Sequence, residues 1–499
     1  MLRWPHDKPI AEADTLDALK PLLAELGGRR REAGTLHAVI ARRPKPDAAI
    51  QESPGAYGPW IAASLRETAS VLHSRLRSCK SRRDCSATQR SPVVMHSAGG
   101  QRKRAVVIGG SIGGLFAGLF LRRVGWDVSI HERAGEELGS RGAGIATHDE
   151  LHEALALATG QGGEIGVAVG GRIVLARSGD VVCEVARPQV LASWDRIWQR
   201  LRRGAGDVYR HGSALVSVEQ DKQRAFARFD DGSEVAADLL VAADGIQSTV
   251  RRQVMPAVGP RYAGYVAWRG LVDMVELSAE ARDLLRNRFA FCLPDREQAL
   301  GYPVDGGLGS AGRYNCVWYR PADPAQDLSR LLTGADGRQY SGAVPPDRLH
   351  PDVLARMRAD AAALLAPPFA EVMTKARQPL LQAIVDLETP AMIVGRVALL
   401  GDAAFVARPH VGMGTTKAAG DARVLADHLA RHDDIDAALA HYGAERLAYG
   451  QRVVRRGRHL GAYMQAQTAS DEEQRQARHF RQPEVVMTET ASMHGLENW

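Results

Sequence analysis

The chain has 499 residues, of which 45% are hydrophobic and 24% charged, a composition typical of a globular protein with two or three domains. Its formal charge of +6 would favour a polyanionic partner, but residues 1–104 hold 19 Lys and Arg against 10 Asp and Glu. The rest of the chain therefore carries −3, which argues against a nucleic-acid partner. Apolar runs are too short for a membrane span, and no secretory signal is recognised. Five cysteines without metal-type spacing favour a reduced, cytoplasmic compartment.

Residues 1–103 differ in composition from the rest of the chain. Pro44, Pro46 and Pro54 separate two short helical patterns, and residues 75–104 are basic and poor in large apolar side chains. Such a segment buries too little apolar surface to offset the entropy lost on ordering. We expect a leader that is disordered or lies upstream of the natural start, for which Met95 is suitable, rather than a small helical extension.

The stretch that ends at Glu132 carries the clearest pattern in the chain. Ala105–Ile108 is a short apolar run typical of a buried parallel strand, and the glycine-rich turn Gly109–Gly114 leads from it into an apolar helix. A second strand, Val128–His131, delivers Glu132. This order matches a dinucleotide-binding unit, in which a helix N-terminus binds a pyrophosphate and the acid binds a ribose hydroxyl. Ser111 replaces the usual middle glycine. At this point FAD, NAD and a glycine-rich turn without a ligand all remain open.

The remaining chain alternates between β-rich and helical patterns. In chain order, these patterns predict a glycine-rich loop at 135–144, a helix at 148–158, a hairpin at 165–185, a helix at 193–203, strands at 215–219, 225–229 and 237–242, a β-rich region at 262–319, helices at 352–365 and 369–376, a strand at 396–400, and helices at 416–432 and 436–464. The β-rich region lacks a βαβ rhythm, so we expect a separate antiparallel sheet there. The tail beyond Thr468 is polar and is expected to be irregular.

Two further motifs come directly after predicted strands. They are Asp244-Gly245 and Gly401-Asp402. Because the carboxyl ends of parallel strands form the ligand-binding edge of an open α/β sheet, we expect both carboxylates beside the Gly109–Gly114 turn. The later segment Pro409–Gly414 offers consecutive backbone N–H groups at a helix N-terminus, which stabilise negative charge such as that of a reduced flavin.

These motifs, in this order, resemble the single-component FAD-dependent aromatic hydroxylases, the group A flavoprotein monooxygenases related to p-hydroxybenzoate hydroxylase. The resemblance covers about residues 104–464. The segments Tyr262-Ala-Gly-Tyr-Val-Ala-Trp-Arg-Gly270, Gly301-Tyr-Pro303 and Arg408-Pro-His410, together with Ser111, look most like the branch that hydroxylates N-heterocycles such as dihydroxypyridine. Two later carboxylates and the lack of a second βαβ unit select FAD as the bound cofactor.

The resemblance implies a set of FAD-binding residues. For the pyrophosphate it implies Gly109, Ser111, Ile112, Gly113 and Gly114, and for the adenosine ribose Glu132 and Arg133. For the pyrophosphate–ribitol half it implies Asp244 and Asp402, and for the isoalloxazine Pro409, Gly412, Met413 and Gly414. Many relatives carry an FAD-contacting arginine on the helix near residues 193–196, and this chain departs from that pattern with Ser193-Trp-Asp-Arg196.

The family's chemistry implies that NADH or NADPH reduces FAD transiently and that O2 forms a flavin C4a-hydroperoxide, which hydroxylates an electron-rich ring. Water must be excluded, and a substrate hydroxyl must be deprotonated or strongly hydrogen-bonded. We expect Tyr262 to orient or activate the substrate, with His410 as the second candidate and Arg251 as the match to an arginine of urate-hydroxylating relatives. Tyr265 and Tyr302 are further candidates, although half-buried packing is the ordinary role of a strand tyrosine.

The sequence therefore predicts an α/β fold with a discontinuous Rossmann-like FAD-binding domain, an antiparallel substrate domain and C-terminal helices. Residues 104–165, 188–258 and 378–465 are assigned to the FAD-binding domain, 166–187 and 259–377 to the substrate domain, and 466–499 to a flexible tail. The expected reaction is hydroxylation of a hydroxylated N-heteroaromatic ring by a homodimer that uses O2 and NAD(P)H and has no metal, nucleic acid or membrane partner. The alternatives are hydroxylation of a phenolic acid or urate-like purine, and a non-catalytic FAD-binding protein.

Overall fold

The computed structural model describes residues 102–139, 144–306, 312–467 and 470–496. The chain divides after Ala98, and all described residues belong to the second part. The predictions for residues 1–101 therefore lie outside the described residues.

The first sheet has the strand order β17-β18-β10-β1-β2-β6. Its strands are β1 (Arg104–Ile108), β2 (Asp127–His131), β6 (Tyr209–Arg210), β10 (Leu239–Ala242), β17 (Ile393–Val394) and β18 (Val397–Leu399). All neighbours are parallel except β17 and β18. The short apolar runs of β1 and β10 are buried because helices cover both faces of a parallel sheet.

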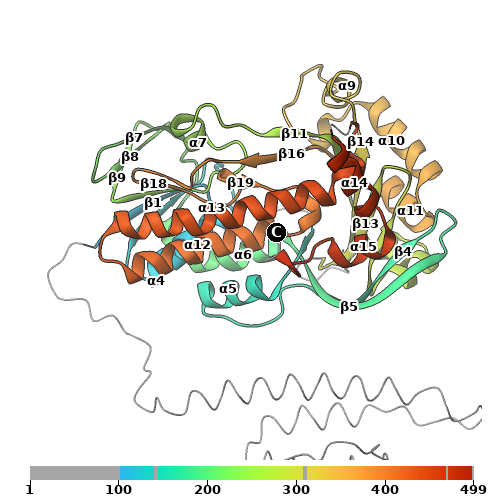
Figure 1. Cartoon of the computed structure of the whole chain (residues 1–499), viewed down its shortest axis with the longest axis horizontal. Helices are drawn as coiled ribbons and strands as arrows, with labels where there is room; N and C mark the ends of the chain where they lie inside the picture. The colour runs from blue at the N-terminus through green and yellow to red at the C-terminus, as the bar shows by residue number, and fades with distance from the viewer. Residues whose placement is uncertain (1–101, 140–143, 307–311, 468–469, 497–499) are drawn as a thin grey trace, which may run out of the picture. The chain divides into compact units, whose positions relative to one another are not determined.

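The helices around this sheet are α4 (Ile112–Arg123), α5 (Asp149–Thr159), α6 (Trp194–Ala205), α7 (Thr249–Val254), α12 (Gly414–Arg431) and α13 (Ile435–Leu460). Figure 1 shows α12 and α13 running side by side as the two longest helices of this part. The buried faces of α4 and α12 pack against each other and on the parallel sheet, and with it form the first apolar core. This is the Rossmann-like architecture that the sequence predicts.

The second sheet has the strand order β15-β16-β11-β14-β13-β12-β4-β5-β3, with β19 paired to β16. Its strands are β3 (Gly144–Ala146), β4 (Val167–Leu175), β5 (Val181–Ser193), β11 (Arg261–Asp273), β12 (Arg288–Cys292), β13 (Gln298–Val304), β14 (Arg313–Pro321), β15 (Ala343–Val344), β16 (Leu380–Glu388) and β19 (Phe405–Val406). The sheet is antiparallel except where β12 meets β4. A separate meander contains β7 (Leu215–Gln220), β8 (Ala225–Phe229) and β9 (Glu234–Ala237).

One face of the second sheet packs against helices in a second core. Its helices are α8 (Ala279–Leu285), α9 (Leu328–Leu331), α10 (Pro351–Leu364) and α11 (Pro367–Lys375). Short 3-10 helices complete the fold: η1 (Gly206–Val208), η2 (Met274–Glu276), η3 (Pro346–Arg348), η4 (Gly401–Ala403), η5 (Pro409–Val411) and η6 (Ala462–Met464). The other face of the sheet packs against the loop before α12 in a third core.

Two features differ from the expected division of the chain. The strands β3 and β16 and the last part of β5 belong to the second sheet, although the sequence assigns their residues to the FAD-binding domain. The tail from residue 466 is not irregular: it forms α14 (Asp471–Phe480) and α15 (Pro483–Glu489), and Phe480, Met487 and Leu496 are buried. Sequence patterning identifies a strand or helix but not the element on which it packs. The few apolar residues of the tail are enough to order it because arginines on β4, β5 and α13 also bind its backbone.

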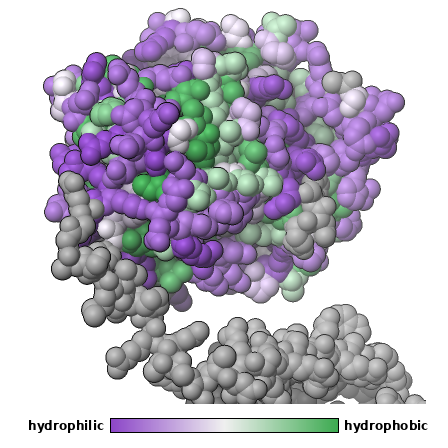
Figure 2. All heavy atoms as spheres, turned by 60° about the vertical axis from the view of Figure 1, so that its left-hand side comes forward, coloured by the Kyte–Doolittle hydropathy of each residue, from purple (hydrophilic) through white to green (hydrophobic). Residues whose placement is uncertain are grey.

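Among the described residues, no helix combines the length and apolar character that crossing a membrane requires. The face in Figure 2 is mostly hydrophilic, with one band of apolar surface near its centre.

Candidate active site

The carboxyl ends of four neighbouring strands bring the predicted motifs to one edge of the parallel sheet. The order β18-β10-β1-β2 places the turn after β1 between the Asp244 motif and Glu132, with the Asp402 motif one strand further. Backbone hydrogen bonds continue across this edge, from Ala243 N–H to the Ile108 carbonyl at 2.8 Å and from Leu400 N–H to the Ala242 carbonyl at 2.9 Å. The three motifs therefore form one continuous site.

The turn after β1 depends on glycine. Gly109 has a φ of +105°, and a Cβ there would lie 2.4 Å from the Ala243 carbonyl oxygen. A Cβ on Gly114 would lie 1.8 Å from the Gly109 carbonyl oxygen, so neither position accepts a side chain. Ser111 is the N-cap residue of α4 but makes no capping hydrogen bond through its side chain, and the first turn of α4 has no acidic residue. The N-terminus of α4 is therefore suited to an external anion.

Glu132 and Tyr209 hold the turn from both sides. Glu132 Oε2 accepts a hydrogen bond from Gly110 N–H at 2.8 Å, and its Oε1 accepts one from Ala134 N–H at 2.9 Å. The Tyr209 hydroxyl and the Trp198 indole donate to the Gly110 carbonyl at 3.1 and 3.0 Å. Arg133 follows Glu132 on the surface. The acid thus fixes the turn and presents its carboxylate beside the predicted ribose position.

Asp244 has an unsatisfied oxygen at this edge. Its Oδ2 accepts hydrogen bonds from the N–H groups of Thr249 and Val250 at 2.7 and 3.2 Å, at the start of α7. Its Oδ1 is buried and has no partner among the described residues. Burial raises the pKa of this carboxyl above its ordinary value. A buried acceptor of this kind needs a donor, which a ligand hydroxyl would supply.

A buried charge network supports the Gly401-Asp402 motif. Lys417 Nζ donates to the Gly401 carbonyl oxygen at 2.8 Å and lies 3.4 Å from Asp421, which also forms an ion pair with Arg446 at 2.7 Å. Gly401 has a φ of +61°. Asp402 itself is exposed at this edge. Asp402 is thus accessible to a ligand while its backbone is held rigidly.

The segment Pro409–Gly414, here called the flavin loop, ends at the N-terminus of α12. No side chain caps that terminus, its first turn has no acidic residue, and a Cβ on Gly414 would meet open space. Gly412 has a φ of +64°, and Met413 is fully buried. With the N-terminus of α4, this is the second uncapped helix end at the same edge.

These observations agree with a bound FAD. Gly109–Gly114 and the α4 N-terminus fit a pyrophosphate, the orphaned Asp244 oxygen and exposed Asp402 fit hydroxyl groups, and the open space at Gly414 fits a ring near the α12 N-terminus. Gly113 lies close to Leu400 and Ala418, so the α4 turn and the α12 turn approach each other. No group of three or more potential metal ligands occurs among the described residues.

His410 is buried in the flavin loop and both its ring nitrogens are engaged. Nε2 lies 2.9 Å from the Tyr265 hydroxyl, and Nδ1 lies 3.2 Å from Gln298 Oε1. Because the glutamine oxygen accepts only, Nδ1 carries the proton and Nε2 accepts from the tyrosine. Burial lowers the pKa of His410 to about 3, helped by Arg408 and Arg269, so the imidazole is neutral. His410 thereby anchors the flavin loop to the second sheet.

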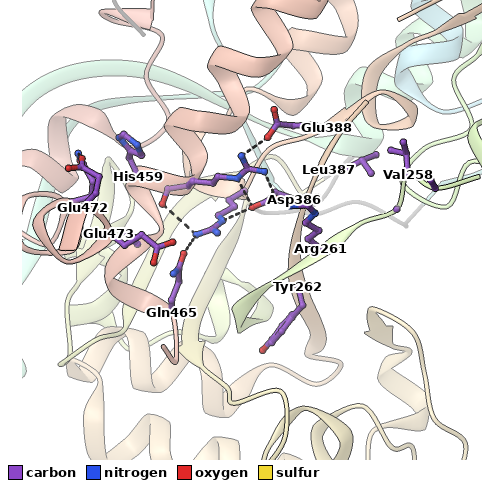
Figure 3. A pocket seen from close by; sticks show the side chains of 16 residues that line it. Val258, Arg261, Tyr262, Asp386, Leu387, Glu388, His459, Gln465, Glu472 and Glu473 are labelled. Atoms are coloured by element: carbon purple, nitrogen blue, oxygen red, sulfur yellow. Dashed lines mark hydrogen bonds and ion pairs between the residues drawn. The ribbon is translucent and has the colours of Figure 1, made fainter. Parts of the chain in front are cut away.

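Side-chain alternation separates Tyr262 from this site. Along β11, Tyr265 packs in the core shared with the flavin loop, whereas Tyr262 packs against the core of α10 and α11 on the opposite face. The Tyr262 hydroxyl donates to the Ala322 carbonyl at 2.9 Å, and burial raises its pKa. Tyr262 also lines a cleft of about 650 Å³, where its ring points away from the ion pairs of Asp386 with Arg408 and Arg458 (Figure 3). The structure thus does not bring Tyr262 to His410.

Arg251 joins two motifs instead of facing the second sheet. It is buried, and its guanidinium donates to the Ala403 carbonyl at 2.9 Å and to the Ile246 carbonyl at 2.6 Å. Its Nε has no partner among the described residues. Arg251 therefore fixes the Asp244 motif to the Asp402 motif.

The sequence reasoning gave Tyr302 a minor place and missed Asn315. These residues face each other across β13 and β14, on the side of the sheet that carries Tyr319 and packs against the flavin loop. A Cβ on Gly144 would lie 2.5 Å from the Tyr302 ring and 3.0 Å from its hydroxyl oxygen. Asn315 Oδ1 accepts from Gly144 N–H at 3.4 Å, while its buried Nδ2 has no partner among the described residues. The available sequence signal for Asn315 was a polar residue among the apolar residues of β14, at a position that is buried.

The comparisons with known proteins agree with this geometry. A model of the FAD binding domain-like family matches residues 262–386. The 2,6-dihydroxypyridine 3-monooxygenase of Paenarthrobacter nicotinovorans is 31% identical over 365 residues, covering 72% of this chain and 91% of that protein. The FAD-dependent urate hydroxylase of Klebsiella pneumoniae is 29% identical over 373 residues, covering 69% and 85%.

Solved structures give the same result. The 2,6-dihydroxypyridine-3-hydroxylase of Arthrobacter nicotinovorans aligns with a TM-score of 0.70 at 30% identity, covering 74% of this chain and 95% of that chain. Klebsiella pneumoniae HpxO complexed with FAD and uric acid aligns with a TM-score of 0.61 at 25% identity, covering 76% and 92%. The chain therefore belongs to the FAD-dependent aromatic hydroxylases, and it is a flavoprotein monooxygenase that binds FAD.

Proposed function

We propose that the protein hydroxylates a small N-heteroaromatic ring that already carries a hydroxyl group, with a dihydroxypyridine as the first candidate and NADH or NADPH and O2 as co-substrates. The observation that carries this proposal is the pairing of Tyr302 with Asn315 beside the flavin loop. An amide with an unsatisfied Nδ2 and a phenol offer polar contacts to ring substituents within an otherwise apolar site. The dihydroxypyridine and urate hydroxylases among its relatives support a hydroxylated heterocycle.

Tyr302 and Asn315 would orient and activate the ring. Bound FAD supplies the activated oxygen that such a ring attacks. Burial raises the pKa of the Tyr302 hydroxyl, so it remains a hydrogen-bond donor at neutral pH. Asn315 Nδ2 is a second donor. Two donors directed at one ring oxygen favour its deprotonated form, which increases the electron density of the ring.

His410 acts as a positioning residue in this proposal. Because its neutral ring is held by Tyr265 and Gln298, it keeps the flavin loop at a fixed place against the second sheet. The surrounding core also contains Tyr319, whose ring centroid lies 4.2 Å from that of His410, so aromatic side chains pack closely around this part of the loop. Exclusion of water protects a reactive oxygen species from decomposition.

A phenolic acid is the second candidate substrate, and Arg269 favours it. Arg269 lies on β11, and its Nε donates to Gln382 Oε1 at 3.2 Å. Its positive charge acts to lower the pKa values of Tyr302, Tyr319 and His410, although burial has the larger effect and raises the pKa values of the two tyrosines. A guanidinium near these rings could bind a carboxylate.

The test uses the full chain loaded with FAD. Dihydroxypyridines, uric acid and phenolic acids are offered with NADH and, separately, NADPH, while nucleotide oxidation, H2O2 release and product mass are followed. We expect a dihydroxypyridine to stimulate oxidation and to gain one oxygen atom. Hydroxylation of a phenolic acid alone would contradict the heterocycle assignment, and FAD binding without oxidation stimulated by any of these rings would refute the proposed substrates.

A further inference from the structure

We propose that residues 483–496, here called the C-terminal strap, form a wall of the flavin and substrate site and position the flavin loop. The inference rests on the proposed function only for its coupling measurement, because FAD binding is independent of the substrate. It begins with one contact: Ala491 N–H donates to the His410 carbonyl oxygen at 2.8 Å.

The strap also packs closely against the loop. A Cβ on Gly412 would lie 2.7 Å from both Cα and Cβ of Ala491 and 3.5 Å from Ala146 on β3. The loop, the strap and β3 thus meet at one point, where Gly412 leaves room for the strap. Ala491 has a φ of +50°, a conformation that costs free energy in a residue other than glycine and persists where surrounding contacts enforce it.

Three arginines supply those contacts by binding the backbone of the strap. Arg172 on β4 is fully buried and donates to the carbonyl oxygens of Met487 and Thr490 at 2.5 and 2.6 Å. Arg456 on α13 donates to the His494 carbonyl at 2.8 Å and forms an ion pair with Glu489. Burial, with a smaller effect of Arg187, lowers the pKa of Arg172 to about 9. Burying a guanidinium group is costly unless hydrogen bonds compensate for the lost water, and the carbonyl oxygens of the strap accept such bonds, so these arginines favour one register of the strap.

Arg187 and Gln189 on β5 complete the contacts with the strap. Arg187 on β5 donates to the Thr488 carbonyl at 2.7 Å and to Ser492 Oγ at 2.5 Å, and Gln189 Nε2 donates to the Ala491 carbonyl at 3.1 Å. The strap residues 491–494 then line a cavity of about 450 Å³ with His148, Arg187 and Gln189. His148 Nδ1 lies 3.0 Å from Thr416 in the first turn of α12, so this cavity adjoins the flavin end of the site.

The strap therefore separates the flavin loop from solvent, and loosening it should uncouple nucleotide oxidation from hydroxylation. Arg187→Ala is the test variant because Arg187 is only partly buried and touches the strap without touching the loop. Loss of its two hydrogen bonds should raise the population of the loosened strap about fivefold or more. Arg177→Ala, on the exposed turn of the same hairpin, is the matched control.

The holoenzyme variants are compared by three measurements. Hydrogen exchange of segments 408–414 and 484–492, iodide quenching of flavin fluorescence, and H2O2 released per nucleotide oxidised should all increase in Arg187→Ala and remain unchanged in Arg177→Ala. Ser492→Ala, which removes one acceptor of the same contact, is used if Arg187→Ala does not fold. Faster exchange confined to 484–492, with unchanged flavin quenching, would overturn the proposal. Exchange and quenching do not require turnover, so a wrong substrate assignment would leave their result intact.

Discussion

Asp421 on α12 accepts a hydrogen bond from the backbone N–H of Gly401 at 3.1 Å, and so connects the helix to the strand end that presents Asp402. The same carboxylate pairs with Lys417 and Arg446, all three side chains being almost completely buried. The backbone of the Asp402 motif therefore depends on a buried carboxylate on the neighbouring helix.

Asp421→Asn should destabilise the protein and weaken FAD binding. Removing one member of a buried ionic group leaves Lys417 and Arg446 uncompensated, which typically costs about 3–5 kcal/mol. Urea unfolding and FAD titration measure the two effects. Asp427→Asn, on the same helix but with a side chain 44% exposed, should change the free energy of unfolding by less than about 1 kcal/mol. Equal effects of the two substitutions would contradict the role assigned to Asp421.

Gly114→Ala should disrupt the Gly109–Gly114 turn, the predicted pyrophosphate site. The new Cβ would overlap the Gly109 carbonyl oxygen, so the turn or α4 must move, at a typical cost of about 1–3 kcal/mol or more. We expect a lowered melting temperature and loss of FAD from the purified protein. Gly135→Ala, where a Cβ meets nothing within 4 Å, is the control and should retain the flavin. Normal FAD content in Gly114→Ala would refute the close packing described for this turn.

Tyr302→Phe should lower kcat/KM for the aromatic substrate about 10- to 100-fold, because a hydrogen bond to a charged ring oxygen is worth about 1.5–3 kcal/mol. Steady-state kinetics with product analysis provide the measurement. Tyr314→Phe, on the neighbouring strand but in the core of the other face, should have little effect on kinetics. Tyr262→Phe should likewise cost only stability, through the lost contact with Ala322. A larger kinetic loss in Tyr262→Phe than in Tyr302→Phe would favour Tyr262 as the substrate-contacting residue.

His410 should make the folded protein sensitive to acid. Because burial lowers its pKa to about 3, the unfolded chain binds a proton at this histidine between about pH 6.5 and 3 that the folded chain does not bind. The free energy of unfolding should therefore fall as pH decreases through this range, by up to about 1.4 kcal/mol per pH unit from this group. Chemical unfolding at several pH values should show a shallower slope for His410→Asn than for the unmodified protein. An unchanged slope in His410→Asn would mean that His410 binds protons equally in the folded and the unfolded chain, which would contradict its lowered pKa.

The sequence determined the motifs and the edge on which they lie. The glycine spacing after β1, the acid after β2 and the two Asp-containing strand ends are local patterns, and local geometry suffices to predict a parallel sheet that gathers them. The order of these motifs also carried the resemblance that the comparisons confirm at the level of the family. The Lys417 and Asp421 positions gave no comparable signal, since a charged pair four residues apart on a helix is usually a surface feature.

The tertiary structure decided which polar side chains surround the flavin loop. Tyr262 and Tyr265 differ by three residues, and only the pairing of β11 shows that Tyr265 faces His410, 145 residues away in sequence. The position of the C-terminal strap also depends on the tertiary structure. Arg172 and Thr490, which are hydrogen-bonded, are separated by 318 residues, and the polar sequence of the tail suggested no buried position. Strand register and long-range hydrogen bonds set these contacts, because side chains distant in sequence meet only after the two sheets and the C-terminal helices have packed together.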